Sequence, residues 1–443
     1  MVDAQDQSLT EKKTNTRWWI AFMMWLAIAI NYIDRGNLSV AIPLMAREFD
    51  LSPAIMGIVL SAFFWPYFLL QIPAGWFADR VGHRLSFALS VGSWSVATAV
   101  TALARGTASL VGIRILLGIG EAGAYPSAAG VTSRWFPDKE RSRVSSIFDS
   151  GAKFGAAVAL PFTAWLILRT GWRGTFILSG IIGIAWTIAW WIYYAEPEKH
   201  KYMNAAELKY IREGQVKHEG LGGVQPMQWY ELLKYRNIWA MCLGFFTMNY
   251  VSYFFYTWFP VYLTKVHKLP LMKMGLIASV PLIISMFVEV GSGWLADHLY
   301  ARGWPITKVR KTLLIGGGLL AASVALAIFA HTVVWAIVIM SFCKSGHAIA
   351  NSQVWTLPGD VAPQNMTSQV ASLQNTVSNL AGVVGPIVTG VILQVTQSFD
   401  WALIVLASIA VLGAMNYLFF LGKVEPIRPK PVGAAQTVGA SGC

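Results

Sequence analysis

Long apolar runs recur along the whole chain, and they constrain the fold more than any other feature of the sequence. Two examples are "GIVLSAFFWPYFLLQIPAGWFA", which begins at Gly57, and "TFILSGIIGIAWTIAWWIYYA", which begins at Thr175. A helix of roughly 20 such residues crosses the hydrocarbon core of a bilayer, which is about 30 Å thick. Only 13% of the 443 residues are charged, whereas soluble domains carry about 25%. The sequence therefore predicts a polytopic membrane protein.

The apolar runs predict an all-α membrane protein with twelve transmembrane helices. Helices are expected because a lipid-exposed backbone must satisfy its hydrogen bonds within one segment. The expected spans are 18–44, 54–78, 85–104, 108–135, 143–168, 174–195, 238–264, 274–299, 310–330, 332–358, 367–394 and 398–421. A charged segment, 196–237, separates spans six and seven and is expected to contain a short surface helix.

The distribution of Lys and Arg predicts the orientation of the chain. With the N-terminus inside, inside segments hold 23 of the 34 basic residues, outside loops hold seven and the spans hold four. This bias places both termini in the cytoplasm by the positive-inside rule. The net charge of +12 is then explained by topology, so a nucleic-acid partner is not expected. We expect a bacterial inner-membrane location.

A short repeat divides the chain into two halves. The sequences "QIPAGWFADRVGHR" and "EVGSGWLADHLYAR" share the pattern Gly-Trp-x-Ala-Asp, and each copy ends the second span of a six-span half. Parallel six-helix repeats around a central cavity are a transporter architecture. The predicted organisation is a first half at 1–195, a cytoplasmic linker at 196–237, a second half at 238–423 and a cytoplasmic tail at 424–443.

Charged residues inside the spans are candidates for function. A charge at the centre of a membrane helix costs about 2.5–3.5 kcal/mol on insertion scales, so it is usually paired or functional. Asp34 and Arg35 lie deep in the first span but point about 100° apart, so each needs its own partner. In span four, Arg114 and Glu121 share a face about 10.5 Å apart, which leaves room for a substrate, a water or Asp34 between them. The alternative is a fixed ion-pair network that only holds the helices in register.

Several segments resemble one family of transporters. The loop "GWFADRVGHR" matches the signature G-x-x-x-D-R-x-G-x-R of the major facilitator superfamily. The segments "NYIDRGNLSVAI", "RILLGIGEAGAYPS", "RWFPDKERSR" and "YTWFPVYL" resemble, more narrowly, the anion:cation symporter family. That family includes bacterial sugar-acid/proton symporters and the animal sialin and vesicular glutamate transporters.

The resemblance implies roles for the buried polar residues. Asp34 and Glu121 match the implied proton carriers, with Arg114 in coupling and substrate binding. Arg35 matches an implied carboxylate-binding residue, since its planar fork can donate two parallel hydrogen bonds. Tyr32 and Tyr67 match aromatic hydroxyl positions that line the cavity.

Amides in the eleventh span suggest a substrate contact in the second half. Gln374, Asn375 and Asn379 lie in "LQNTVSNLAG", and the last two share a helix face. They are expected to hydrogen-bond substrate hydroxyls. The alternative is a polar clasp between helices.

Lys153 departs from the family pattern, which often has an amide near Ala152. Lys153 can pair with Asp149, four residues earlier on the same helix. It can instead supply the cavity with an extra cation, which would favour a substrate with a second carboxylate.

The loop signature and its repeat are expected to form a gate rather than a binding site. Asp79 can hold the inward gate shut by meeting a helix N-terminus or a basic partner. The predicted gating residues are Gly75, Asp79, Arg80, Gly82, Arg84 and Asp297.

Together these patterns predict a monomeric, proton-coupled symporter that imports a small organic anion by alternating access. The preferred substrate is a hexonate, hexarate or hexuronate, and the alternative is an aromatic carboxylate such as phthalate. No enzyme, cofactor or metal site is expected, with the proton as the coupling ion. A membrane sensor that binds without transporting is a rival class, disfavoured because no sizeable soluble output domain accompanies the spans.

Overall fold

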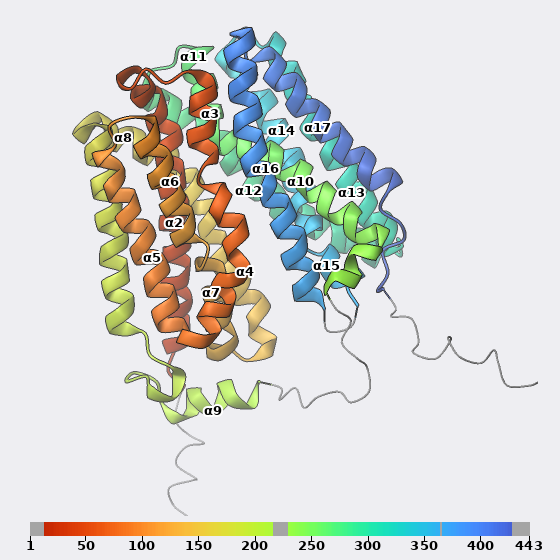
Figure 1. Ribbon diagram of the computed structural model, residues 1–443. Coiled ribbons are helices and arrows are strands. Elements are labelled where there is room, and N and C mark those ends of the chain that lie inside the picture. The colour runs from red at the N-terminus through yellow and green to blue at the C-terminus, as the bar shows by residue number, and fades with distance from the viewer. Residues whose placement is uncertain (1–12, 216–228, 364–365, 428–443) are drawn as a thin grey trace, which may run out of the picture.

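A computed structural model describes residues 13–215, 229–363 and 366–427, and all regular structure in these ranges is helical. The helices run along a common direction in two bundles, α2 to α8 and α10 to α17, with α9 beneath the first bundle (Figure 1). We call the end of the molecule at which α9 lies the α9 end. The all-α prediction is confirmed for the described chain.

The first bundle begins with the long helix α2, Thr16–Glu48, which is about 50 Å long at 1.5 Å per residue. Several spans are built from two helices in succession. The remaining elements of this bundle are α3 (Pro53–Ser61), α4 (Phe64–Val81), α5 (His83–Val100), η2 (Thr101–Leu103), α6 (Thr107–Glu121), α7 (Ala124–Trp135) and α8 (Asp138–Tyr193).

The second bundle repeats this arrangement. Its elements are α10 (Arg236–Thr257), α11 (Phe259–Lys265), α12 (Leu271–Ala301), α13 (Ile306–Ala321), η5 (Ala322–Phe329), α14 (Val333–Val354), α15 (Leu357–Val361), α16 (Thr367–Thr396) and α17 (Asp400–Phe419). The connection holds η3 (Pro197–Lys199), α9 (Ala205–Glu213) and η4 (Trp229–Lys234).

These helices account for the predicted spans. Ten described segments are long and apolar enough to cross a membrane. One of them, 143–193, holds predicted spans five and six, because Gly171 has φ 70° and turns the chain between them. Helix α2 supplies the first span, although it is not among the ten.

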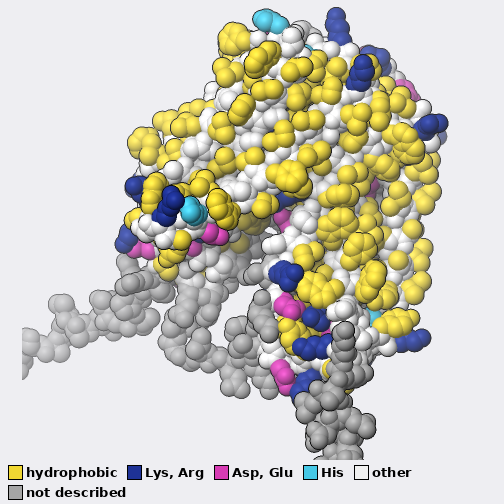
Figure 2. All heavy atoms as spheres, turned by 180° about the vertical axis from the view of Figure 1, so that it is seen from behind, with side chains coloured by type: hydrophobic (Ala, Val, Ile, Leu, Met, Phe, Trp, Pro, Cys, Tyr) yellow, Lys and Arg dark blue, Asp and Glu magenta, His cyan; other side chains and the backbone are white. Residues whose placement is uncertain are grey.

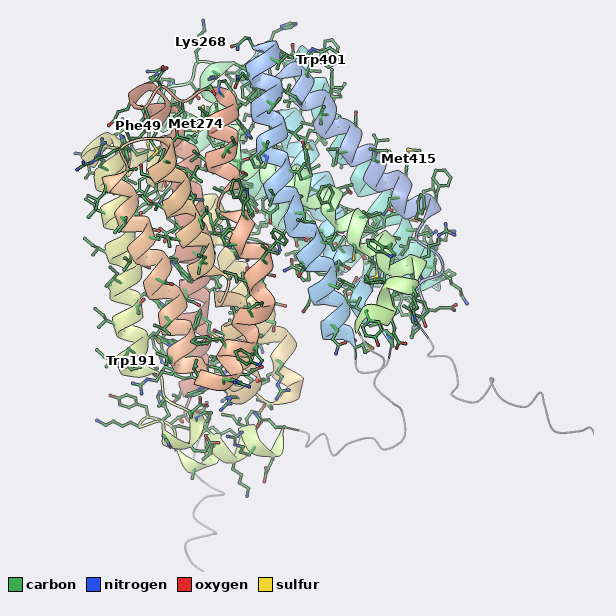
Figure 3. The ribbon with its side chains drawn as sticks, viewed as in Figure 1. Phe49, Trp191, Lys268, Met274, Trp401 and Met415 are labelled. Atoms are coloured by element: carbon green, nitrogen blue, oxygen red, sulfur yellow. The ribbon has the colours of Figure 1, made fainter. Side chains whose placement is uncertain are left out.

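The outer surface fits a bilayer. Hydrophobic side chains cover its middle, and charged side chains gather toward the ends (Figure 2). Exposed Trp191 marks the α9 end, whereas exposed Trp401 lies at the opposite end, as Lys268 does (Figure 3). Tryptophan is enriched at both membrane–water interfaces, so the long helices span the bilayer.

The two bundles touch closely at the end opposite α9. A side-chain carbon on Gly57 of α3 would clash with the carbonyl oxygen of Pro386 in α16, and one on Gly390 with that of Pro53. The backbone amide of Ala54 also donates to Gln394 Oε1 at 3.2 Å. Glycine permits such close backbone approach, so this end of the interface is closed.

The interface is open toward the α9 end. Figure 2 shows the surface hollowed between the two bundles on that side. The pocket described below lies between the closed end and this hollow.

Helix α9 is the surface helix expected in 196–237, and it is anchored to the first bundle. Asn204 caps it by accepting from the backbone amide of Glu207 at 3.0 Å. The fully buried Glu207 carboxylate pairs with Arg17 at 2.7 Å. The ion pair between Glu207 and Arg17 therefore holds α9 against the first turn of α2.

Candidate functional site

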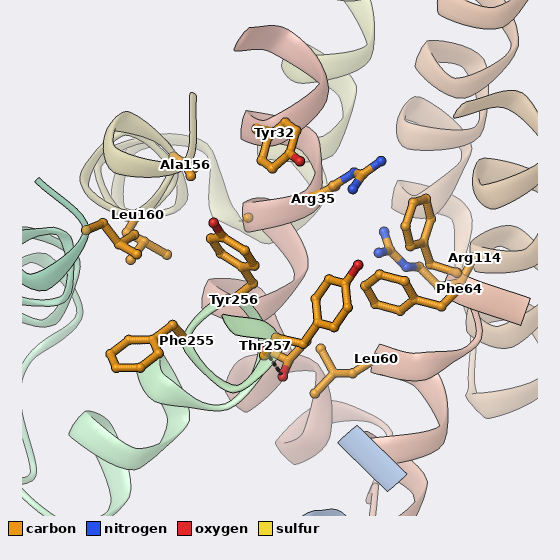
Figure 4. A pocket seen from close by; sticks show the side chains of 15 residues that line it. Tyr32, Arg35, Leu60, Phe64, Arg114, Ala156, Leu160, Phe255, Tyr256 and Thr257 are labelled. Carbon is orange, nitrogen blue, oxygen red and sulfur yellow. Dashed lines mark hydrogen bonds between the residues drawn. The ribbon is translucent and has the colours of Figure 1, made fainter. Parts of the chain in front are cut away.

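A pocket lies between the two bundles, and its wall is mainly aromatic and aliphatic (Figure 4). Two cationic side chains, Arg35 from α2 and Arg114 from α6, lie in the same wall (Figure 4). Burial in such a wall strengthens electrostatic interactions relative to water. The aromatic lining residues are Tyr32, Phe63, Phe64, Tyr253, Phe255 and Tyr256.

Arg35 forms an ion pair with Glu121 across α2 and α6. Its Nε lies 2.7 Å from Glu121 Oε2, and the Glu121 side chain is fully buried. The guanidinium carbon lies 4.9 Å from the ring centre of Tyr32 and 4.7 Å from that of Tyr67. The two rings contact the guanidinium, and Arg35 is also a lining residue of the pocket.

Arg114 is buried, and it forms no ion pair within the described chain. It is 4% exposed, and its Nε and Nη1 lack a hydrogen-bond partner. The seven-residue spacing predicts a gap between Arg114 and Glu121, and Arg35 from α2 is the group that pairs with Glu121. In the described chain Asp34 makes no ion pair within 4 Å of Arg114, and its place between Arg114 and Glu121 stays a prediction.

Asp34 occupies a separate buried position. Its Oδ1 accepts from Asn37 Nδ2 at 3.4 Å, and its Oδ2 has no hydrogen-bond partner among the described residues. Asn37 also bonds to Ser179 at 2.9 Å and to Thr163 at 2.6 Å, both in α8. Asp34 and Arg35 thus have different partners, as their angular separation on the helix predicts.

The two predicted tyrosines lie at different depths. Tyr32 lines the pocket and meets Tyr256 of the second bundle edge to face, with ring centres 6.3 Å apart. Tyr67 is buried and stacks on Phe63 at 5.1 Å. Its ring contacts Arg35, but it is not among the residues that line this pocket. Its predicted contact with substrate stays a prediction.

The three amides of α16 are engaged in contacts between helices. Gln374 donates to the carbonyl of Val354 at 3.2 Å, and Asn375 donates to Gln71 of the first bundle at 3.2 Å. Asn379 accepts from the hydroxyl of the pocket residue Tyr253 at 2.6 Å. The geometry resembles the clasp alternative, and substrate contact by these amides stays a prediction.

Lys153 pairs with the second bundle and not with Asp149. Its Nζ lies 2.9 Å from Glu289 Oε1 of α12, and the same oxygen accepts from Asn351 at 3.1 Å. Asp149 accepts from the hydroxyl of Tyr125 at 3.4 Å. The expected pair within the helix is therefore wrong, because α12 brings a carboxylate to Lys153 that helix spacing alone does not reveal.

Sequence reasoning missed most of the second wall, including Tyr253, Tyr256 and the buried lysine Lys344. Lys344 Nζ donates to Ser252 Oγ at 2.8 Å and lies 5.1 Å from the ring centre of Tyr256. A signal was present: Lys344, His347 and Asn351 are spaced by three and four residues, which places them on one face of α14.

The residues of the loop signature lie away from the pocket, at the α9 end. Gly82 has φ +87°, a conformation that favours glycine at the turn after α4. Arg80 lies over the Trp76 ring at 4.1 Å, and Arg84 donates to the carbonyl of Trp191. The position of Gly75 is close to Pro126 of α7.

The two repeated aspartates are exposed. No basic nitrogen lies within 4 Å of Asp79 or Asp297 in the described chain. The lack of a basic partner for these aspartates in the described chain is consistent with an interface that is open at the α9 end. Their role in gating stays a prediction.

Comparison with known proteins identifies the family. The model of the Major Facilitator Superfamily matches residues 24–386. The chain belongs to this superfamily. It is therefore a transporter and not an enzyme, and the predicted fold class is confirmed.

Two relatives cover nearly the full length. A D-galactonate transporter of Escherichia coli O6:H1 is 33% identical over 424 residues, covering 94% of this chain and 98% of the relative. The probable galactarate/D-glucarate transporter GudP of Escherichia coli strain K12 is 33% identical over 445 residues, covering 97% and 98%. These relatives agree with the predicted resemblance to the anion:cation symporter family.

A solved structure has the same fold. The inward-facing, occupied structure of a bacterial homologue of the human lysosomal transporter Spinster superposes with a TM-score of 0.75 at 19% identity, covering 92% of this chain and 97% of that one. At this identity the likeness concerns the fold alone.

Proposed function

We propose that this protein is a proton-coupled symporter that imports a sugar acid, a hexonate, hexarate or hexuronate, by alternating access. The names of the two relatives support the substrate class. The observation that carries the proposal is the ion pair between Arg35 and the buried Glu121 in the pocket wall. A proton can compete with Arg35 for Glu121, and a substrate carboxylate can compete with Glu121 for Arg35.

The coupling follows from this competition. When Glu121 is charged, it holds Arg35 and reduces the attraction of Arg35 for an anion. A proton on Glu121 neutralises the carboxylate, and the Arg35 fork then binds the substrate carboxylate. Asp34 is the second proton carrier, and its orphaned Oδ2 provides a position for the proton. Loss of the protons restores the ion pair and expels the anion.

The direction of transport follows from the topology. We place both termini, and hence the α9 end, in the cytoplasm of a bacterium, with the helices in the inner membrane and the protein a monomer. The conformation closed by α3 and α16 is then inward-facing. Import requires that this contact open and that the hollow between the bundles close.

An aromatic carboxylate is the alternative substrate. Six aromatic side chains line the pocket, and two of them, Phe64 and Tyr253, meet across the bundles with ring centres 4.4 Å apart. Aromatic rings stack on a benzoate or phthalate ring as well as on the apolar faces of a sugar chain.

Counterflow in liposomes tests the substrate class. Purified full-length protein is reconstituted, the vesicles are loaded with one unlabelled acid, and exchange of the labelled acid is followed for galactonate, glucarate, glucuronate and phthalate. We expect exchange of at least one sugar acid. Exchange of phthalate alone would favour the alternative, and no exchange with any acid would refute the proposal.

A further inference from the structure

The pocket is flanked by two buried cations that come from opposite bundles. Arg114 belongs to the first bundle and Lys344 to the second, and both are 4% exposed. Within the described chain, neither has a carboxylate oxygen within 4 Å. A buried cation that lacks an anionic partner is costly, so each is a position where an anion would be favourable.

The surroundings of Lys344 place it directly behind the second pocket wall. Its Nζ lies 5.1 Å from the ring centre of Tyr256 and 5.5 Å from that of Phe255, and both rings line the pocket. Within the described chain, its one hydrogen bond goes to the neutral Ser252 hydroxyl. An ammonium has three donors, so donors remain for a ligand that displaces the Tyr256 ring.

Lys153 is less suited than Lys344 to attract an anion into the pocket. Its side chain is 36% exposed, and it already pairs with Glu289 at 2.9 Å. Glu289 also accepts from Asn351. Its charge acts on Lys344 as well, but in the described chain only Lys153 lies within 4 Å of its carboxylate. Lys344 is therefore the more deeply buried of the two lysines and the one without a carboxylate in contact.

The charges around the pocket favour a dianion in the proton-loaded state. The acidic side chains are Asp34, Glu121, Asp149 and Glu289, and the basic ones are Arg35, Arg114, Lys153 and Lys344. With His347 neutral, these eight charges cancel. Protons on Asp34 and Glu121 leave an excess of two positive charges, which a substrate with two carboxylates matches.

We propose that Lys344 binds a second carboxylate, so that the transported acid is a dicarboxylate held between the two bundles. One carboxylate meets Arg35 and Arg114, and the other meets Lys344. This inference rests on the proposed function and specifies its substrate. A monocarboxylate leaves Lys344 without an anion, and such unpaired buried groups are an effective basis for discrimination.

Calorimetric titration of the purified full-length protein tests this proposal. The acids form matched pairs that differ in one carboxylate: galactarate with galactonate, glucarate with gluconate, and phthalate with benzoate. In at least one pair, we expect the dicarboxylate to bind about tenfold or more tightly than its partner. The pair that binds also distinguishes a sugar acid from an aromatic acid.

Three variants assign the preference to Lys344. Lys344→Gln should bring the ratio of the two dissociation constants close to one, and Lys344→Arg should retain most of the preference. Lys209→Gln is the control, because Lys209 lies on α9 with its side chain 52% exposed, and it should leave the ratio unchanged. The wild-type ratio tests the proposal even if Lys344→Gln fails to fold.

The outcomes separate this proposal from the proposed function. Equal or tighter binding of the monocarboxylate in every pair that binds would overturn the dicarboxylate proposal and leave the symporter intact. An equal loss of affinity for both acids of a pair in Lys344→Gln would also overturn the dicarboxylate proposal. No binding of any acid would overturn both.

Discussion

Arg35 pairs with Glu121 through its Nε and also lines the pocket. Protonation of one carboxylate can therefore change the charge that a substrate meets. The sequence predicted Asp34, Arg35, Arg114 and Glu121 as a buried group, because charges are rare and costly in apolar spans. It could not predict that Arg35 pairs with Glu121, since this depends on how α2 and α6 are rotated against each other.

Replacing Glu121 by glutamine should uncouple transport from protons. The amide resembles a permanently protonated carboxyl, so Arg35 stays available to the substrate. We expect counterflow exchange to continue, while accumulation driven by a proton gradient is lost. Both can be measured with labelled acid in reconstituted vesicles.

Glu48→Gln is the matched control, because Glu48 forms a partly exposed ion pair with Arg173 at 2.6 Å, away from the pocket. It should accumulate acid as the wild type does. Unchanged coupling in Glu121→Gln would remove Glu121 from the proton pathway.

Replacing Arg35 by lysine should weaken substrate binding by about tenfold or more, which corresponds to about 1.4 kcal/mol. A lysine keeps the charge but loses the planar fork and its contacts with the Tyr32 and Tyr67 rings. Titration calorimetry measures the dissociation constant, with Arg173→Lys as the control. An unaltered affinity would exclude Arg35 from the binding site.

At the scale of elements, the hydrophobic runs predicted nearly all of the long helices, because a membrane helix is specified by length and hydropathy. The breaks within spans, such as the one between α3 and α4, were not predicted. The break between α3 and α4 lies at Phe63, a residue of the pocket wall. The second wall of the site was missed because aromatic residues such as Tyr256 look the same in sequence whether they face lipid or a cavity.

The Glu207→Ala substitution should destabilise the α9 end. It removes the closest carboxylate of the buried Arg17, which keeps its pair with Glu140 at 3.2 Å. The loss of hydrogen bonds to a charged group costs about 1.5–3 kcal/mol. A clear fall in the unfolding temperature of the purified protein is expected. Glu213→Ala is the control, since Glu213 is 68% exposed. Equal unfolding temperatures for the two variants would contradict the docking role of α9.

Gly57→Val should impair transport by obstructing the contact between α3 and α16. A side chain at this position meets the carbonyl of Pro386, so the closed arrangement at this end is destabilised. We expect slower uptake with substrate binding retained in the alternate conformation.

Gly112→Ala is the matched control, because a side-chain carbon there meets nothing within 4 Å. It should transport normally. Normal uptake by Gly57→Val would show that this contact is not part of the transport cycle.

At the scale of the whole molecule, the Gly-Trp-x-Ala-Asp repeat predicted two six-span halves, and the two bundles lie side by side with the pocket between them (Figure 1). The sequence did not predict which end of the interface is closed. Both conformations of a transporter use the same sequence and differ by small free energies. The contacts of Gly57 and Gly390 specify the one seen here.

Proton-driven accumulation tests the central claim most directly. Vesicles containing the full-length protein are given an inward proton gradient, and the internal concentration of the acid that exchanges in counterflow is followed. We predict accumulation above the external concentration, its collapse when a protonophore is added, and its absence in Asp34→Asn. Accumulation that does not depend on the proton gradient, or that persists in Asp34→Asn, would contradict the account.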